Sequence, residues 1–307
     1  MRLDRPRRAA LVVRATILAF PALAAAIAAM PFGSAAAAER AVGAWMITDA
    51  SAPAALIRGA HVVSAGAGTV LEAGDILATA DGAPLQVEAG PGIVIGLGPS
   101  TKAWFAGPSR HDAADVVVLS GWVKMQLPRG AAGTTAAWIV DFPQEAVAST
   151  SGSYVAHAAD QRLEVFVEAG RHAASRLPRA GAGVELPVDR AATWVAERPV
   201  QFAERPAVEF VAAMPAGFRS PLYAIGAKVA AVRVDAAAGR PVGYADVAPW
   251  LKGAPELRRG LVARFRPRLA DDAFRRALDA ELGNGPDWKP ILHPPPPPAT
   301  GAAKGSR

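Results

Sequence analysis

The chain of 307 residues contains no cysteine. It can therefore form no disulfide, carry no thiolate nucleophile and build no cysteine-ligated zinc site, so its fold must be stabilised by packing. Histidine is also scarce, and the five histidines are scattered along the chain: His61, His111, His157, His172 and His293. This spacing excludes a local zinc motif such as HExxH.

Short catalytic motifs are missing as well. The chain has no GxSxG motif around a nucleophilic serine, no Walker loop for phosphate and no SxxK motif. We therefore expect a protein that is not an enzyme and that uses no metal or cofactor. A hydrolase whose two carboxylates are far apart in the sequence is the alternative.

Long apolar runs are limited to the N-terminus. The run from Ala15 to Met30 follows five arginines and precedes Ala36-Ala37-Ala38, which fits the pattern of a signal-peptide cleavage site. We predict that residues 1–38 are a signal peptide and that the protein is periplasmic or secreted. After cleavage it would not be an integral membrane protein. The alternative is that the leader stays uncleaved as an anchor.

A strong excess of positive charge is also absent from the predicted mature chain. The formal net charge of +6 falls to +2 when the five arginines and one aspartate of the leader are removed. A chain with so little net charge gives no indication of nucleic-acid binding.

What the sequence does contain is a long stretch typical of β-structure. Between residues 56 and 175, short apolar runs are interrupted about every eight to twelve residues by Gly, Pro, Asp or Ser, as in a sandwich or roll. The clearest strand is Arg162 to Ala169, in which Leu163, Val165 and Val167 alternate with polar residues. We expect residues 143–171 to form the closing pair of strands of this mainly β domain.

Five motifs follow one another in this stretch. They are GDILATA at 74–80, IVIGLGPSTKAWF at 93–105, LSGWVKMQL at 119–127, TSGSYV at 150–155 and LEVFVEAG at 163–170. In order and spacing they resemble the FecR-type periplasmic domain, with Ser100 in place of a turn asparagine and Gly152-Ser153 in place of a Gly-Thr turn. The resemblance implies an all-β extracytoplasmic module that senses or scaffolds. The fourteen or so residues before the apolar run are too few for the cytoplasmic anti-sigma segment of that family's regulators.

The remaining segments differ in composition. Residues 39–55 are expected to be a lead-in, and 176–243 an irregular connector. The connector contains four candidate strands: Val184–Leu186, Thr193–Val195, Pro206–Ala213 and Lys228–Val234.

Residues 244–292 are predicted to form a small helical subdomain. Asp246 and Asp271 are candidate N-caps, and Pro255 suits the first turn of a helix. The proline-rich residues 293–307 are predicted to be a disordered tail.

Three large aromatic side chains are expected on outer faces of the strands. In the strand that ends at Leu127, strict alternation directs Trp122 away from the core, and Trp104 and Phe166 are directed outward in the same way. With their polar neighbours they define a candidate ligand or partner surface: Lys102, Trp104, Trp122, Lys124, Gln126 and Phe166. Two alternatives stay open, that the C-terminal segment covers these aromatics and that a one-residue register slip inverts the faces.

A second candidate surface is basic. It comprises the arginines of the predicted helical subdomain that could contact an anionic partner: Arg258, Arg259, Arg264, Arg266 and Arg268. The alternative is a solvated helix surface on which these arginines pair with nearby carboxylates.

Together these observations predict an exported, non-enzymatic protein that acts as a binding or scaffolding module of the cell envelope. Its partner would be an envelope protein or a glycan. The alternatives are an extracytoplasmic sensor component of a FecR-like system and the hydrolase mentioned above.

Overall fold

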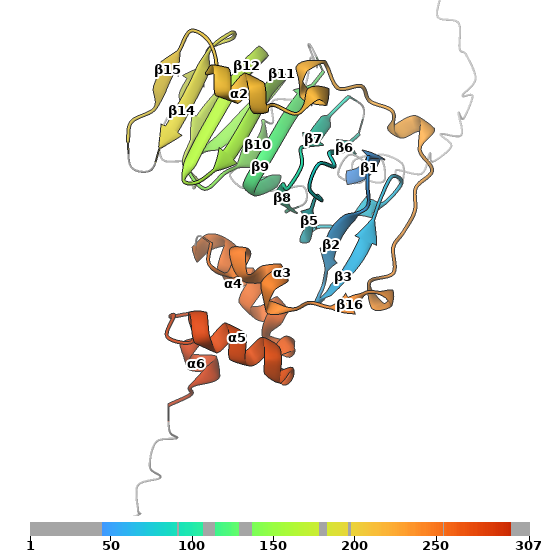
Figure 1. The fold of residues 1–307 in the computed structure, drawn as a ribbon, viewed down its shortest axis with the longest axis vertical. Coiled ribbons are helices and arrows are strands. Elements are labelled where there is room, and N and C mark those ends of the chain that lie inside the picture. Colours follow the sequence, from blue (N-terminus) through green and yellow to red (C-terminus); the bar gives the residue numbers. More distant parts are fainter. Residues whose placement is uncertain are drawn as a thin grey trace, which may run out of the picture.

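The computed structural model describes residues 45–295, apart from 91, 107–113, 129–136, 178–182, 196–197 and 254. The predicted signal peptide and most of the predicted tail lie outside the described residues. The described part is mainly β, with a few short helices near the C-terminus, as predicted (Figure 1). Among the described residues, no helix is both long and apolar enough to cross a membrane.

Sixteen strands belong to one curled sheet. They are β1 (Trp45–Ala50), β2 (Ala54–Arg58), β3 (His61–Ala65), β4 (Val70–Leu71), β5 (Asp75–Ala78), β6 (Leu85–Ala89), β7 (Val94–Leu97), β8 (Lys102–Phe105), β9 (Val116–Leu127), β10 (Trp138–Asp141), β11 (Ala146–Ala159), β12 (Arg162–Ser175), β13 (Val184–Leu186), β14 (Ala191–Val195), β15 (Gln201–Ala203) and β16 (Arg240–Pro241). The predicted lead-in thus contains β1, and Trp45 and Ile47 of β1 are part of the main core.

The helices are short and most of them follow the strands. They are α2 (Val208–Ala213), η1 (Ala216–Arg219), η2 (Gly226–Lys228), η3 (Ala236–Ala238), α3 (Tyr244–Leu251), α4 (Pro255–Phe265), η4 (Arg266–Ala270), α5 (Asp272–Leu282) and α6 (Lys289–Leu292). Pro255 opens α4 and Asp271 caps α5, as predicted, and the Asp271 side chain accepts hydrogen bonds from Ala273 N and Phe274 N. Asp246 instead lies in the first turn of α3, where it accepts a hydrogen bond from Gly243 N at 2.8 Å.

The sheet branches at β9. Its first half pairs with β8 and β10, and its second half pairs with β7 and β11. The two branches curl around a main core to which most strands contribute. One strand therefore belongs to both layers of a roll, and it must bend where it passes from one to the other.

This bend changes which side chains of β9 face the core. Val116 and Val118 lie in the main core before the bend, and Val123 and Met125 do so after it. The predicted strict alternation is wrong for the first half of β9, because the register shifts near Gly121. Gly121 has a φ of 108°, and a Cβ there would lie 2.3 Å from Thr101 Oγ1, so no other residue fits this bend.

The predicted closing pair of strands is the long hairpin of β11 and β12. Its turn lies at Asp160 and Gln161, whose φ values are 49° and 61°. Gly152-Ser153 does not reverse the chain: it lies inside β11, at a bulge opposite Gly170. A Cβ on Gly152 would lie 2.0 Å from the Ala169 carbonyl oxygen, so the glycine permits a close approach of two strands.

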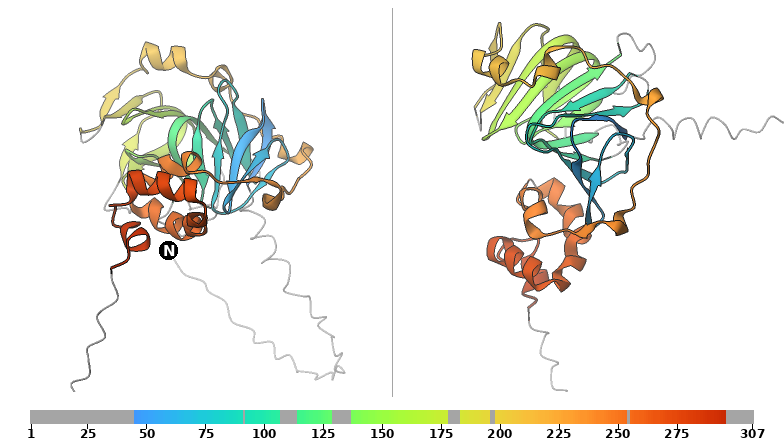
Figure 2. Two further views of the ribbon diagram at one scale, coloured as in Figure 1. Left: turned by 60° about the horizontal axis from the view of Figure 1, so that its bottom comes forward. Right: turned by 45° about the vertical axis from the view of Figure 1, so that its right-hand side comes forward.

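Two segments cover outer faces of the roll. The first, which we call the helical cover, comprises α3 to α6, residues 244–292. It packs Trp250, Phe265 and Trp288 against the branch that contains Ile76 and Val117. Figure 2 shows the helical cover and α2 at opposite ends of the roll.

The second covering segment, which we call the strap, comprises residues 207–229. It includes α2, η1 and η2 and crosses the outer face of the other branch (Figure 1). The predicted strand at Pro206–Ala213 is wrong because Phe210, Met214 and Phe218 recur at a spacing of four, which suits a helical turn with one buried face. The connector also supplies β13 and β14 at two of the candidate strands. Both were expected at an edge of the sheet, but β14 lies between β12 and β15. In the candidate strand at Lys228–Val234, Val232 makes an isolated bridge with Thr69.

Candidate functional site between the sheet and its strap

The six residues of the predicted aromatic surface lie in two separate places. Trp122, Lys124 and Gln126 of β9 and Phe166 of β12 lie on the outer face under the strap. Trp104 of β8 instead packs against the helical cover, and Lys102 lies half-buried at the start of β8. The C-terminal segment covers Trp104, as one of the two alternatives expects. Trp122 is instead covered by the strap, which lies in the predicted connector. Whether any of the six contacts a partner stays a prediction.

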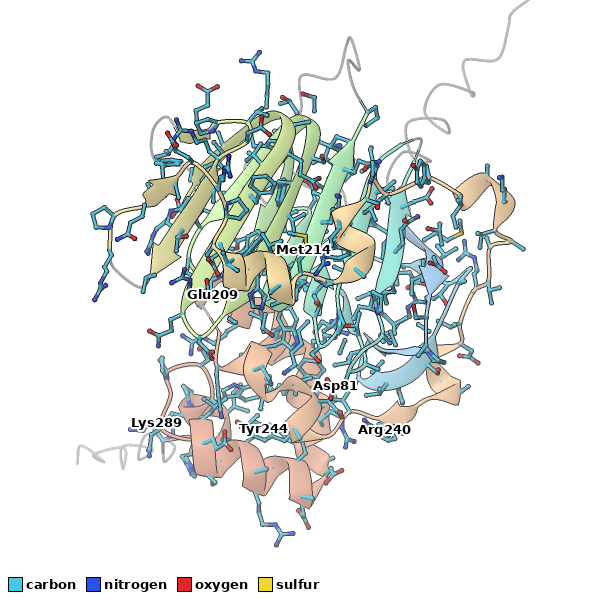
Figure 3. The ribbon with its side chains drawn as sticks, turned by 45° about the horizontal axis from the view of Figure 1, so that its top comes forward. Asp81, Glu209, Met214, Arg240, Tyr244 and Lys289 are labelled. Atoms are coloured by element: carbon cyan, nitrogen blue, oxygen red, sulfur yellow. The ribbon has the colours of Figure 1, made fainter. Side chains whose placement is uncertain are left out.

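One end of the strap face is apolar. Trp122 is 7% exposed and packs with Val155 of β11 and with Phe210, Met214 and Phe218 of the strap. The ring centroids of Trp122 and Phe210 are 4.9 Å apart. Figure 3 shows α2, with Glu209 and Met214 labelled, lying across the strands. This cluster fixes the first part of the strap.

A histidine lies beside this cluster. The imidazole of His157 stacks on Trp122 with 4.1 Å between ring centroids and an interplanar angle of 11°. Burial lowers the pKa of His157, and the nearby Glu164 and Asp160 carboxylates partly oppose that shift. The ring is therefore neutral at physiological pH.

Lys124 lies at the centre of the strap face and is 1% exposed. Its Nζ donates hydrogen bonds to Glu168 Oε1 of β12 and to the Phe218 carbonyl oxygen of the strap, both at 2.8 Å. A buried ammonium group needs such partners, because an unpaired charge away from water is costly. Lys124 thereby joins two strands and the strap main chain.

Further along, the strap is held by its main chain. Gln126 exchanges two hydrogen bonds with Leu222: Leu222 N donates to Gln126 Oε1 at 2.9 Å, and Gln126 Nε2 donates to the Leu222 carbonyl. Glu88 of β6 accepts hydrogen bonds from Ile225 N at 2.7 Å and from Gly226 N at 3.0 and 3.1 Å. Gln86 Nε2 also donates to a strap carbonyl, that of Tyr223, at 2.9 Å. Side chains of the sheet thus bind peptide groups of this part of the strap, and not its side chains.

Glycines allow the close approach. A Cβ on Gly96 of β7 would lie 2.7 Å from Phe218 Cε1, and one on Gly98 would lie 3.1 Å from Pro215 Cγ of the strap. On the strap side, a Cβ on Gly226 would lie 2.8 Å from Glu88 Oε2. The face and the strap therefore fit each other at both ends.

A pocket of about 530 Å³ lies between the sheet and residues 219–221 of the strap, which line it. Its polar lining comes from three strands and the strap: Lys124, Gln126, Ser153, Glu168, Arg219 and Ser220. Arg219 Nη2 donates to the carbonyls of Val211 and Ala212 at the end of α2, at 3.2 and 3.4 Å. The pocket therefore combines two cations with one carboxylate.

Two arginines of the predicted basic surface, Arg264 and Arg268, bind main-chain carbonyls of this chain. Arg264 donates to the carbonyls of Gly59 at 2.6 Å, Ile57 at 2.8 Å and Gly74, which attaches α4 to the turns of the sheet. Arg268 bonds to the Val242 carbonyl at 2.8 Å.

The other three arginines of that set occupy different positions. Arg258 is 3.1 Å from Asp287, Arg266 is exposed, and Arg259 lies in α4. Within the described part of the chain, no three His, Asp or Glu residues are grouped so that they could hold a metal ion.

Three contributors to the strap face were not predicted from the sequence. Gln86 and Glu88 alternate with the core residues Leu85 and Val87, so period-two alternation could have identified them as outward-facing. The strap residue Phe218 could have been found from its spacing to Phe210. No sequence signal brings these residues to Lys124.

Comparisons with known proteins add little to this geometry. No family model matches the chain, and no curated protein does. Two crystal structures of a protein from Parabacteroides distasonis ATCC 8503, described as a candidate anti-sigma factor, are similar in part. They are 17% and 16% identical, with TM-scores of 0.35 and 0.36, and the match covers 45% of this chain and 62% and 63% of theirs. At these TM-scores the likeness carries no argument about function.

Proposed function

We propose that this protein is an exported, non-enzymatic binding module of the cell envelope that holds a protein partner at the pocket beneath the strap. The observation that carries the proposal is the pocket of about 530 Å³ in which the Lys124–Glu168 ion pair and Arg219 meet. A pocket of this size, with a few convergent polar groups, suits a side chain or chain end of a partner. Export and envelope location rest on the predicted leader.

A protein partner is favoured over a glycan. Binding of sugar rings commonly uses an exposed flat aromatic face, but Trp122 is buried and Trp104 packs against the helical cover. The pocket lining contains polar and charged side chains that can pair with peptide groups and charged side chains. Binding rather than glycoside hydrolysis is favoured because most glycosidases use two carboxylates. Among the described residues that line the pocket, Glu168 supplies the one carboxylate, and it is already paired with Lys124.

Site-specific photo-crosslinking in the native cell envelope tests the proposal. A photoreactive residue would replace Ala169, which lines the pocket from β12, and in a matched variant Ala237, which is exposed in η3. We expect a discrete crosslinked protein from position 169 that is absent from position 237. Its yield should fall when Ser153→Phe fills the pocket. Crosslinks of equal yield from both positions, or yields insensitive to Ser153→Phe, would contradict the proposal.

The second candidate function is an extracytoplasmic sensor component of a FecR-like system. It is supported by the order of the five sequence motifs in residues 74–170. A sigma-factor reporter distinguishes the two functions: deletion of the gene changes reporter output if the protein is a sensor and leaves it unchanged if it is a scaffold.

A further inference from the structure

We propose that the outer face under the strap is a groove for an extended peptide segment of a partner protein, and that the strap is its internal, displaceable occupant. This inference rests on the proposed binding function and specifies the partner's chemistry. It is argued from the way in which the strap itself is bound.

The strap is only shallowly embedded. Between residues 207 and 229, the buried side chains are those of Phe210, Met214 and Phe218. Exposed apolar side chains are common in the same segment, with Val208 at 79% and Tyr223 at 72%. Segments with few buried apolar contacts open locally at a small fraction of the global unfolding free energy. The strap can therefore leave the face while the roll stays folded.

The contacts from 218 to 226 do not depend on most strap side chains. Gln126 and Gln86 bind carbonyl and N–H groups of Leu222 and Tyr223 that any extended chain presents. At the two ends of this extended part, Lys124 binds a carbonyl of the turn η1, and Glu88 binds two successive N–H groups where η2 begins. Recognition through main-chain groups, with specificity set by a few pockets, is how proteins bind extended peptides. A partner segment can make the same hydrogen bonds as the strap.

The side-chain requirements define the partner segment. An aromatic residue is needed at the place of Phe218, because its ring lies against Gly96 and its carbonyl meets Lys124. Proline is excluded at the places of Leu222 and Ile225, whose N–H groups are bound. A small residue is favoured at the place of Gly226, since a Cβ there would displace the Glu88 carboxylate that binds the strap.

The unfilled pocket explains how a partner can compete. The strap crosses the pocket with Arg219, Ser220 and Pro221 and leaves about 530 Å³ empty. A partner with a larger polar side chain in place of Ser220 would gain contacts that the strap does not make. It must outcompete a tethered segment, whose effective concentration is on the order of millimolar.

The test measures binding of a fluorescent synthetic peptide with the sequence of residues 214–228 to purified full-length protein. Phe218→Ala in the protein loosens the strap and leaves the groove intact, so it should bind the peptide about tenfold more tightly than the wild type does. Val208→Ala, at an exposed strap position, should bind like the wild type. Combining Phe218→Ala with Lys124→Met should abolish binding, and a peptide with alanine at the Phe218 position should bind about tenfold more weakly.

A folded Phe218→Ala protein that binds the peptide no better than the wild type would overturn the inference, and so would binding that is indifferent to the peptide's phenylalanine. Amide exchange in the wild type provides a second measurement that needs no variant. The amides of Leu222, Ile225 and Gly226 should exchange well before those of β9. If the strap amides exchanged only on global unfolding, as the β9 amides do, the inference would also be overturned. A crosslinked envelope partner without peptide binding would leave the proposed function standing, whereas peptide binding without a crosslinked partner would leave only the groove.

Discussion

The helical cover and the strap both lie on outer faces of the same sheet, but they contact it with different parts of the chain. The helical cover inserts large side chains, and Trp250, Phe265 and Trp288 are almost completely buried. The strap buries three side chains near its start, and from Phe218 to Gly226 it is held mainly by hydrogen bonds from its main chain to side chains of the sheet. Water cannot replace the apolar contacts that a buried side chain loses when it becomes exposed. It can replace the hydrogen bonds that a released peptide group loses. The comparison indicates that the helical cover is part of the stable fold and that the strap is releasable.

The largest expected effect is that of Phe265→Ala in the helical cover. Phe265 is fully buried, so its removal should lower the free energy of unfolding by about 3–5 kcal/mol. Urea unfolding followed by circular dichroism measures this loss. Phe218→Ala in the strap serves as the matched variant and should cost clearly less, because the strap opens before the roll unfolds. Equal losses of unfolding free energy in the two variants would show that the strap contributes to the stable fold as much as the helical cover does.

Arg264→Met removes the three hydrogen bonds that attach α4 to the sheet. We expect a loss of about 2 kcal/mol, because partly buried carbonyls lose a charged donor. Arg266→Met, at an exposed position two residues later, should change stability by less than about 0.5 kcal/mol. The comparison of the two variants in urea unfolding separates a structural arginine from a surface arginine. A similar effect of both would contradict the assigned role of Arg264.

Glu88→Gln tests how the strap is attached to the sheet. Glu88 is buried and accepts hydrogen bonds from Ile225 and Gly226, so its loss of charge should accelerate amide exchange in residues 222–228 by about tenfold. The helical cover should show unchanged exchange. Glu204→Gln, at an exposed position outside the strap, is the control. Acceleration throughout the chain would mean that Glu88 stabilises the whole fold rather than the strap.

The smallest expected effect is a pH dependence. Burial holds the pKa of His157 and of His172 below the usual value of about 6.5, so the unfolded chain binds a proton at each ring before the folded chain does. Stability should therefore be highest above that value and fall as the pH drops through the window below it. Urea midpoints at several pH values between 8 and 5 would measure this. Replacing both histidines by Gln should reduce the dependence of the urea midpoint on pH. An unchanged dependence would show that other titratable groups cause it.

His172 also shows what tertiary contacts add to a lone residue. In the sequence it is one of five scattered histidines. In the structure it is 3% exposed at the bulge between β11 and β12, where Nε2 donates to the Ala169 carbonyl at 2.7 Å and Nδ1 accepts from the Ser149 hydroxyl at 2.8 Å. Its role is to satisfy main-chain and side-chain groups at a bulge, and the sequence contains no pattern for that.

Turn and face predictions succeeded or failed for definite reasons. The core positions Leu163, Val165 and Val167 follow from local alternation, and they are confirmed. The predicted turn at Gly152-Ser153 is wrong because a glycine in a strand also permits a bulge, and the two cases have the same local sequence. The outward direction of Trp122 was predicted from strict alternation along the whole strand that ends at Leu127. It is confirmed because the bend of β9 precedes Trp122, so the alternation still holds for the second half of the strand.

The amino-acid sequence by itself determined the mainly β fold, the positions of the strands β13 and β14, the C-terminal helices with the cap at Asp271, and the presence of Trp122, Lys124 and Gln126 on an outer face. These features depend on the periodicity of neighbouring residues. Only the tertiary structure decided what covers each face. The strap meets Lys124 across 94 positions of the chain and Glu88 across 137, and such pairings depend on how the whole sheet curls. The candidate site exists because this long-range closure places peptide groups of one segment against buried polar side chains of another.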